Sequence, residues 1–279
     1  MTVDMGGFAL PYAANNLNVK NINVGSDAKL TLKTSNNTGV NEITADNYKF
    51  ASGSSNATIE FAASSGVPEY TLTNANFGGS GNTIAVTDSV LKLSGTTFNS
   101  HKYLLSNVTL DVLENSDTGN ANTYNFGNLT ITGDSYLKMN LNVEDNTYDK
   151  FIFTGSDGIA ITLSELNISG TPTSSSPDLV KYVIFSGPGS ISLSATADIL
   201  SRNFDTSLEP FVTISETGQH TIGNRRLEVF NESGQSGIQL VKSGAADTLA
   251  AINQKQSDTG KTDFDERGFL FATNGLTHY

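Results

Sequence analysis

The stretch Gly127–Leu137, with the sequence GNLTITGDSYL, carries the local pattern from which the fold can be predicted. Leu129 and Ile131 alternate with polar residues, which is typical of a strand buried on one side. The next four residues, TGDS, accept a left-handed backbone or hydrogen-bond to their own backbone, so they favour a tight corner. An apolar position then returns at Leu137. The stretch therefore predicts a strand, a corner and a second strand in direct succession.

The same order returns along the chain. An Asn followed by alternating apolar residues begins at five positions: Asn21, Asn47, Asn74, Asn107 and Asn128. The steps between them are 26, 27, 33 and 21 residues, and steps of this size are typical of solenoids. The recurrence predicts an all-β chain, a right-handed parallel β-solenoid (β-helix) whose coils add short strands to long sheets. A β-sandwich is the structural alternative, but it does not predict this order at this interval.

The repeat also predicts which side chains stack between coils. The five asparagines named above would form a structural ladder at one corner, sharing side-chain amide hydrogen bonds; the alternative is that Asn is merely abundant. Five phenylalanines fall on inward positions and are expected in the core: Phe50, Phe61, Phe77, Phe126 and Phe153. Five tyrosines fit either the core or a wet edge: Tyr48, Tyr70, Tyr103, Tyr124 and Tyr136.

The pattern divides the chain into three segments. Residues 1–16 are expected to be a lead-in or cap, residues 17–243 the solenoid, and residues 244–279 an irregular C-terminal segment with a short helix. The helix is predicted over Ala245–Gln256, where Leu249 and Ile252 share a face. Thr171–Pro177 is rich in Ser, Thr and Pro and is expected to be a loop or an insertion between coils.

The composition argues against several classes of protein. The chain has 279 residues and no Cys, which excludes disulfide frameworks and cysteine-ligated metal sites. Sixteen Lys and Arg against 28 Asp and Glu give a formal net charge of -12, so a nucleic-acid partner is not expected. No apolar run reaches about 18 residues, so insertion into a membrane as a helix is not expected either. Nothing in the composition suggests a cofactor.

Two short stretches hold groups of chemical interest. Gly133-Asp134-Ser135 is similar to the nucleophile motif of some esterases, but a Ser nucleophile needs a His base oriented by a carboxylate. None of the three histidines lies in such a motif, so a corner is the favoured interpretation: His101, His220 and His278. Glu144–Asp149 concentrates oxygen ligands without the spacing of a calcium loop, which favours a solvated turn. We therefore expect no catalytic, cofactor-binding or metal-ligating residues.

Three stretches together carry a resemblance to a known family. Gly127–Leu137, followed by Leu141–Val143 and Tyr148–Gly155, resembles the last coils of passenger regions of Gram-negative autotransporters and related β-helical surface adhesins. The resemblance covers roughly residues 17–193. It implies an extracellular place on the bacterial cell surface, tethered to the outer membrane. It also implies adhesion or aggregation, with a host-cell or bacterial surface protein or glycan as the partner.

The leading functional hypothesis is thus a non-enzymatic structural and interaction protein. One alternative is a polysaccharide lyase or hydrolase on the same scaffold, which needs two or three carboxylates converging on one outer face. The acidic residues here are scattered, and no two aspartates are adjacent in the sequence. The other alternative is a segment of a phage or fimbrial fibre. Such a fibre needs a flat apolar outer face, and the apolar–polar alternation argues against one.

Overall fold

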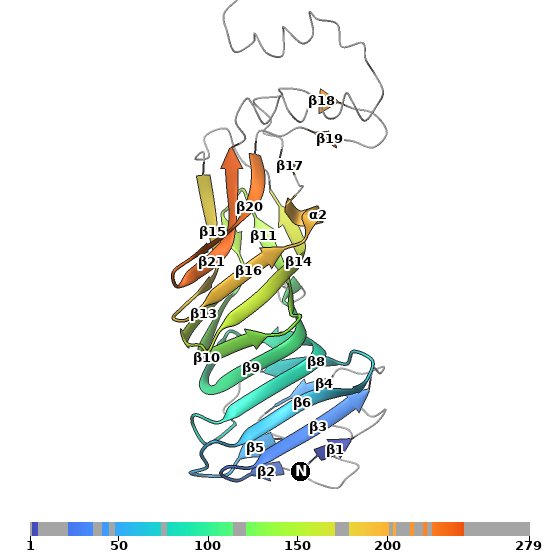
Figure 1. The fold of residues 1–279 in the computed structure, drawn as a ribbon, viewed down its shortest axis with the longest axis vertical. Helices are drawn as coiled ribbons and strands as arrows, with labels where there is room; N and C mark the ends of the chain where they lie inside the picture. The colour runs from blue at the N-terminus through green and yellow to red at the C-terminus, as the bar shows by residue number, and fades with distance from the viewer. Residues whose placement is uncertain are drawn as a thin grey trace, which may run out of the picture.

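The computed structural model describes residues 2–4, 22–35, 41–44, 48–73, 77–113, 121–170, 179–200, 203–204, 213–214, 220–221 and 225–242. Over these ranges the chain is all-β, as predicted, with one short helix, α2 (Ala197–Leu200). Seventeen of the strands form one sheet, while β2 (Ile22–Val24) pairs with β5 (Tyr48–Phe50) and β18 (Thr213–Ile214) pairs with β19 (His220–Thr221) in small sheets of their own. In Figure 1 the blue and green strands lie one above another and cross the long axis of the molecule, whereas several of the yellow to orange strands run closer to that axis.

The strands mostly begin just after polar corners. The first group consists of β1 (Thr2–Asp4), β2 (Ile22–Val24), β3 (Lys29–Ser35), β4 (Asn41–Ile43), β5 (Tyr48–Phe50), β6 (Thr58–Ser65) and β7 (Glu69–Thr73). The middle group consists of β8 (Thr83–Ser94), β9 (Thr97–Asp111), β10 (Thr123–Thr132), β11 (Tyr136–Asn142), β12 (Thr147–Tyr148), β13 (Lys150–Gly155) and β14 (Ile159–Ser169). The last group consists of β15 (Leu179–Ser186), β16 (Ile191–Ala195), β17 (Asn203–Phe204), β18 (Thr213–Ile214), β19 (His220–Thr221), β20 (Arg225–Glu232) and β21 (Gln235–Lys242).

Most strands pair in parallel with a strand roughly one sequence repeat away. Lys29 of β3 lies opposite Thr58 of β6, 29 positions on, and Thr123 of β10 lies opposite Lys150 of β13, 27 positions on. Several side-chain hydrogen bonds also join residues 27 positions apart. The long strand β8 pairs first with β6 and then with β7, so it takes part in two ladders. The interval seen in the sequence is thus the interval of strand pairing.

A single apolar cluster fills the space that the strands enclose. The five phenylalanines expected inside are all buried, at most 3% exposed. Tyr124, Phe151 and Phe185 stack ring on ring from one strand to the next, with centroids 5.1 and 5.0 Å apart. Four of the five ambiguous tyrosines are buried as well, and only Tyr136 among those five is exposed. Because full burial of a large apolar side chain stabilises by roughly 1.5–3 kcal/mol, these columns are a major source of stability.

Asparagine and aspartate occupy left-handed backbone positions at the corners. Asp27 and Asn56 have φ of 55° and 56°, and the Asn56 amide donates to the Asp27 carboxylate at 3.2 Å. Asp88 and Asn107 repeat this arrangement, with φ of 51° and 53° and a bond of 3.0 Å. Short polar side chains tolerate this backbone better than other non-glycine residues do. Such a residue marks a corner, either two positions before a strand, as at Asp27 and Asn56, or within a long strand, as at Asp88 and Asn107.

The C-terminal strands differ from the expected uniform parallel arrangement. β20 and β21 form a hairpin whose turn contains Gly234 at φ +74°, and β21 pairs antiparallel with β15. A short hairpin connection of this kind joins antiparallel neighbours only. The hairpin therefore covers one side of β15, whose other neighbour, β13, is parallel.

The structure has one helix that was not predicted, and most of the predicted helix, loop and terminal segments lie outside the described residues. Helix α2, which buries Ile199, was not predicted, because four residues are too few for helical periodicity to show. The helix expected over Ala245–Gln256, the rest of the segment 244–279 and the loop at Thr171–Pro177 lie outside the described residues. So do nearly all residues of the expected lead-in, 1–16.

Candidate functional site

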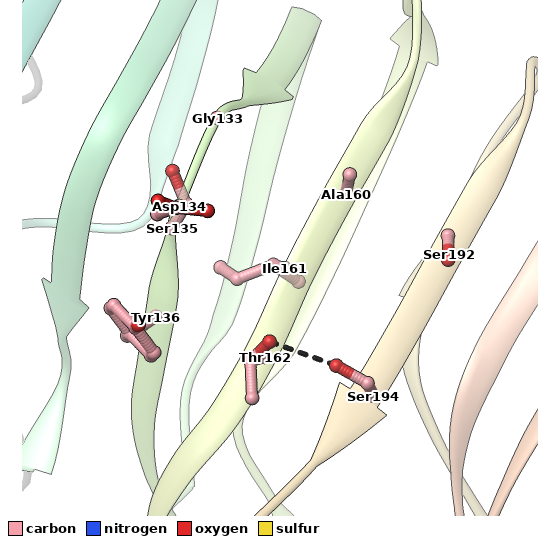
Figure 2. A pocket seen from close by; sticks show the side chains of 9 residues that line it. All are labelled: Gly133, Asp134, Ser135, Tyr136, Ala160, Ile161, Thr162, Ser192 and Ser194. Atoms are coloured by element: carbon pink, nitrogen blue, oxygen red, sulfur yellow. Dashed lines mark hydrogen bonds between the residues drawn. The ribbon is translucent and has the colours of Figure 1, made fainter.

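A shallow groove of about 170 Å³ lies on the outer surface of β11, β14 and β16. Its lining is mostly small and polar: Gly133, Asp134, Ser135, Tyr136, Ala160, Ile161, Thr162, Ser192 and Ser194. Figure 2 shows these residues on the neighbouring strands, with a hydrogen bond of 2.8 Å between the Thr162 and Ser194 hydroxyls. We name this surface the hydroxyl groove. Since drug-sized ligands occupy about 300–1,000 Å³, it suits one small polar ring at a time.

Strand register places the groove's side chains. Tyr136 of β11 lies opposite Thr162 of β14, and Thr162 lies opposite Ser194 of β16. Alternation turns their neighbours Ile161 and Leu193 into the core, where both are buried. Three outward side chains therefore form one row across three strands, and their spacing is fixed by backbone pairing.

The row offers hydrogen-bonding groups beside one aromatic ring. Tyr136 is 42% exposed, and the hydroxyls of Thr162, Ser192 and Ser194 can each donate and accept. Asp134 is the one carboxylate among the lining residues. Glycoside hydrolysis commonly uses a pair of carboxyl groups about 5–9.5 Å apart, and the groove contains no such pair. What this arrangement can do is bind hydroxyl-rich molecules.

Gly133-Asp134-Ser135 forms a corner, as the sequence favoured. Gly133 has φ +69°, and a Cβ there would lie 2.1 Å from Oδ1 of Asn107. Ser135 is 2% exposed; its hydroxyl donates to the Thr132 carbonyl at 2.8 Å and accepts from the Val108 N–H at 3.2 Å. A hydroxyl used in this way joins its own corner to strand β9 and is not presented to a substrate.

The surroundings of His101 do not suit the base that a serine nucleophile needs. It is 3% exposed and packs against Phe50 and Phe77, with ring centroids 5.3 and 5.8 Å away. Neither ring nitrogen has a hydrogen-bond partner. Burial therefore lowers the pKa of His101 to about 4, because the apolar surroundings disfavour the charged imidazolium. The His220 side chain and His278 lie outside the described residues.

The expected asparagine ladder is described at two of its five positions. Asn21, Asn47 and Asn74 lie outside the described residues. Asn107 bonds Asp88 on one side and the Asp134 N–H on the other, both at 3.0 Å. Asn128 is in register with Lys102 and Gly155. Asn107 and Asn128 therefore do not stack on each other. Asn107 lies at a corner and Asn128 lies in the middle of β10, so the two residues occupy different positions in the strand register.

A stacked asparagine pair does occur, at residues that the sequence reasoning missed. Asn167 donates its amide to Oδ1 of Asn140 at 3.1 Å, and Asn140 donates to the Leu113 carbonyl and to Asp149. Asp149 is fully buried and accepts the N–H groups of Asn122 and Asn140, both at 2.9 Å. Burial raises the pKa of Asp149, and these hydrogen bonds oppose the rise. The spacing of 27 between Asn140 and Asn167 was the available signal.

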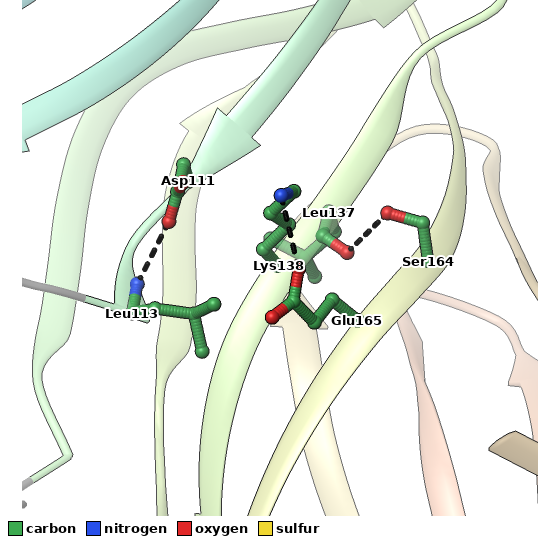
Figure 3. A network of polar contacts seen from close by, with 6 residues as sticks. All are labelled: Asp111, Leu113, Leu137, Lys138, Ser164 and Glu165. Atoms are coloured by element: carbon green, nitrogen blue, oxygen red, sulfur yellow. Dashed lines mark hydrogen bonds and ion pairs between the residues drawn. The ribbon is translucent and has the colours of Figure 1, made fainter.

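A row of alternating charge crosses three strands next to this network. Lys138 lies opposite Asp111 on one side and Glu165 on the other in the parallel ladders. Figure 3 shows the Lys138 ammonium against the Glu165 carboxylate, at 2.9 Å. The hydrogen bond that the Lys138 ammonium donates to Glu165 raises the pKa of Lys138 against the opposing effect of burial, and the charges of Glu165 and Asp111 add to the rise. Opposite charges in register stabilise neighbouring strands, whereas like charges would repel.

Glu144–Asp149 begins with a turn that is held by the side chain of the preceding Asn142. Oδ1 of Asn142 accepts the N–H groups of Glu144 and Asp145 at 3.0 and 3.1 Å, and Asn146 has φ 55°. In the part of the chain that the structure describes, no group of three or more His, Asp or Glu is arranged to hold a metal ion. No helix in those same ranges has the length and apolar character needed to cross a membrane.

Comparison with known proteins finds no matching family model, no matching curated protein and no matching solved structure.

Proposed function

We propose that the stacked strands form a parallel β-solenoid that serves as the scaffold of a surface adhesin. Three observations support the solenoid. Parallel partners lie about one sequence repeat apart, inward aromatic side chains stack from strand to strand, and one apolar cluster runs through the described coils. A solenoid coil cannot bury its apolar face alone, so its stability depends on its neighbours.

The proposed activity is weak, repeated binding of neutral glycans or glycan-bearing proteins on host or bacterial surfaces, from an extracellular position. The observation that carries it is the outward row of Tyr136, Thr162 and Ser194 in the hydroxyl groove. Hydroxyls match sugar hydroxyls in both donor and acceptor roles. The Asp134 carboxylate accepts hydrogen bonds and repels acidic sugars, so neutral sugars are favoured.

The expected affinity of a single groove is low. A sugar ring of about twelve non-hydrogen atoms, at roughly 0.3 kcal/mol per atom, binds with a Kd on the order of millimolar. Many copies on one cell would raise the overall avidity, because later contacts form at high effective concentration. The resemblance to autotransporter passengers is consistent with such a multivalent display.

A panel of neutral oligosaccharides, titrated against the purified chain, tests this function. Tyr136→Ala removes the exposed ring and is expected to weaken binding about tenfold. Ile152→Ala is the matched control, because Ile152 is also 42% exposed but lies outside the groove, on β13. Equal binding by both variants, or no binding to any sugar by the parent chain, would refute the groove's role.

The same panel separates binding from cleavage. A non-enzymatic adhesin leaves the oligosaccharides intact, whereas a lyase or hydrolase releases new sugar ends. Release that depends on Asp134 would favour the enzymatic alternative over adhesion.

A further inference from the structure

A second pocket, of about 420 Å³, lies away from the hydroxyl groove, between β12–β13 and β15. Its lining consists of Asn146, Tyr148, Lys150, Leu179, Val180, Lys181 and Tyr182. β13 and β15 pair at Phe151 with Phe185 and at Ile152 with Ser186. The pocket residues precede these pairs in both segments, so the pocket forms where the two segments diverge. We name it the lysine pocket.

An aromatic ring holds the Lys150 ammonium at the wall of this pocket. The Nζ atom lies 4.4 Å from the centroid of the Tyr148 ring. That ring is itself fixed, because its hydroxyl accepts the Val183 N–H at 3.0 Å and the ring packs edge-to-face with Tyr182. A cation over a ring gains attraction from the ring's quadrupole, but the ring neutralises no charge.

The pocket therefore has a net positive charge within an acidic chain. Among the described residues, no carboxylate forms an ion pair with Lys150. The second lysine of the pocket, Lys181, pairs with Glu232, so its charge is compensated. The chain as a whole has a net charge of -12 and repels anions. The uncompensated ammonium at the pocket wall is therefore a local site at which an anion can bind.

We propose that the lysine pocket binds the carboxylate of an acidic sugar, with Lys150 as the charged contact. The exposed amide of Asn146 can bond ring hydroxyls, and Leu179, 48% exposed, offers an apolar surface to ring C–H groups. An acidic peptide or a nucleic acid would need a track of cations, but the adjoining turn has Glu144 and Asp145 instead. One cation beside one amide fits a single carboxylate.

The experiment titrates the full chain with galacturonic acid oligomers, followed by ligand-observed NMR, with neutral galactose oligomers as the reference. The acidic oligomers are expected to bind, and Lys150→Gln is expected to weaken that binding about tenfold. Lys102→Gln, which removes an exposed lysine on β9, is expected to leave it unchanged.

Three results would overturn the proposal. They are equal binding of the uronate by the parent and by Lys150→Gln, no uronate binding at all, and binding of a poly-glutamate peptide more tightly than the uronate. The Tyr136→Ala variant separates this site from the hydroxyl groove: it should weaken neutral-sugar binding and leave uronate binding unchanged. Failure of one site therefore leaves the other testable.

Discussion

At the scale of single residues, short polar side chains shape the corners of this chain. Asn107 shows how: it adopts a left-handed backbone, donates to Asp88 and accepts from the Asp134 N–H. One residue thereby fixes its own turn and joins two neighbouring segments. Substitutions at Asn107 can separate the contribution of the backbone conformation to stability from the contribution of the two hydrogen bonds.

We predict that Asn107→Ala lowers the free energy of unfolding by about 2 kcal/mol, because alanine resists this φ and both hydrogen bonds are lost. Asn107→Gly relieves the backbone cost and should be the milder change. Urea unfolding of the two variants measures the difference. A glycine variant less stable than the alanine variant would contradict this explanation.

The burial of His101 predicts that the free energy of unfolding decreases in acid. Its folded pKa of about 4 lies below the ordinary value of 6.5. The unfolded state therefore binds the proton more readily, so stability falls as pH drops from about 6.5 towards 4 and is unaffected above this window. The loss should reach about 2–3 kcal/mol.

The variant His101→Phe isolates this contribution. It keeps an aromatic ring beside Phe50 and Phe77 and removes the titrating group. The difference in unfolding free energy between the parent and the variant should grow as pH falls from 6.5 to 4. A difference that does not change with pH would show that His101 does not titrate in this way.

At the scale of strands, register decides which side chains meet. The alternation of apolar residues was enough to predict strands, inward phenylalanines and a corner at Gly133-Asp134-Ser135. It could not predict which Asn lies beside which, because Asn128 and Asn107 look alike in sequence but sit mid-strand and at a corner. Nor could it predict the hydroxyl groove, whose row joins residues 26 and 32 positions apart.

The charge row across three strands gives a prediction at this scale. Lys138→Glu places three acidic groups in register and should lower the unfolding free energy by about 1 kcal/mol, more than Lys138→Gln does. The side chains are partly exposed, so 1 M salt should narrow the gap between the two variants. A gap that is the same at low and high salt would argue against an electrostatic cause.

At the scale of the whole molecule, the same stacking that buries the core also places the two proposed sites. The hydroxyl groove spans three parallel strands, and the lysine pocket opens where two segments diverge. Both sites depend on the order in which strands are stacked. That order is set by contacts between residues far apart in sequence, which is why the sequence alone predicted strands and corners but no binding surface.

The most direct test of the parallel strand arrangement is a disulfide between two strands that this arrangement places side by side. Asn125 and Ile152 are parallel partners, 27 residues apart, and the chain has no Cys, so a double variant forms one defined bond. Asn125→Cys with Ile152→Cys should cross-link rapidly under mild oxidation, since partnered Cα atoms lie within disulfide reach. Lys102→Cys with Ile152→Cys, on strands separated by β10, should not. Equal cross-linking of the two pairs, or none in the first, would contradict the parallel stack.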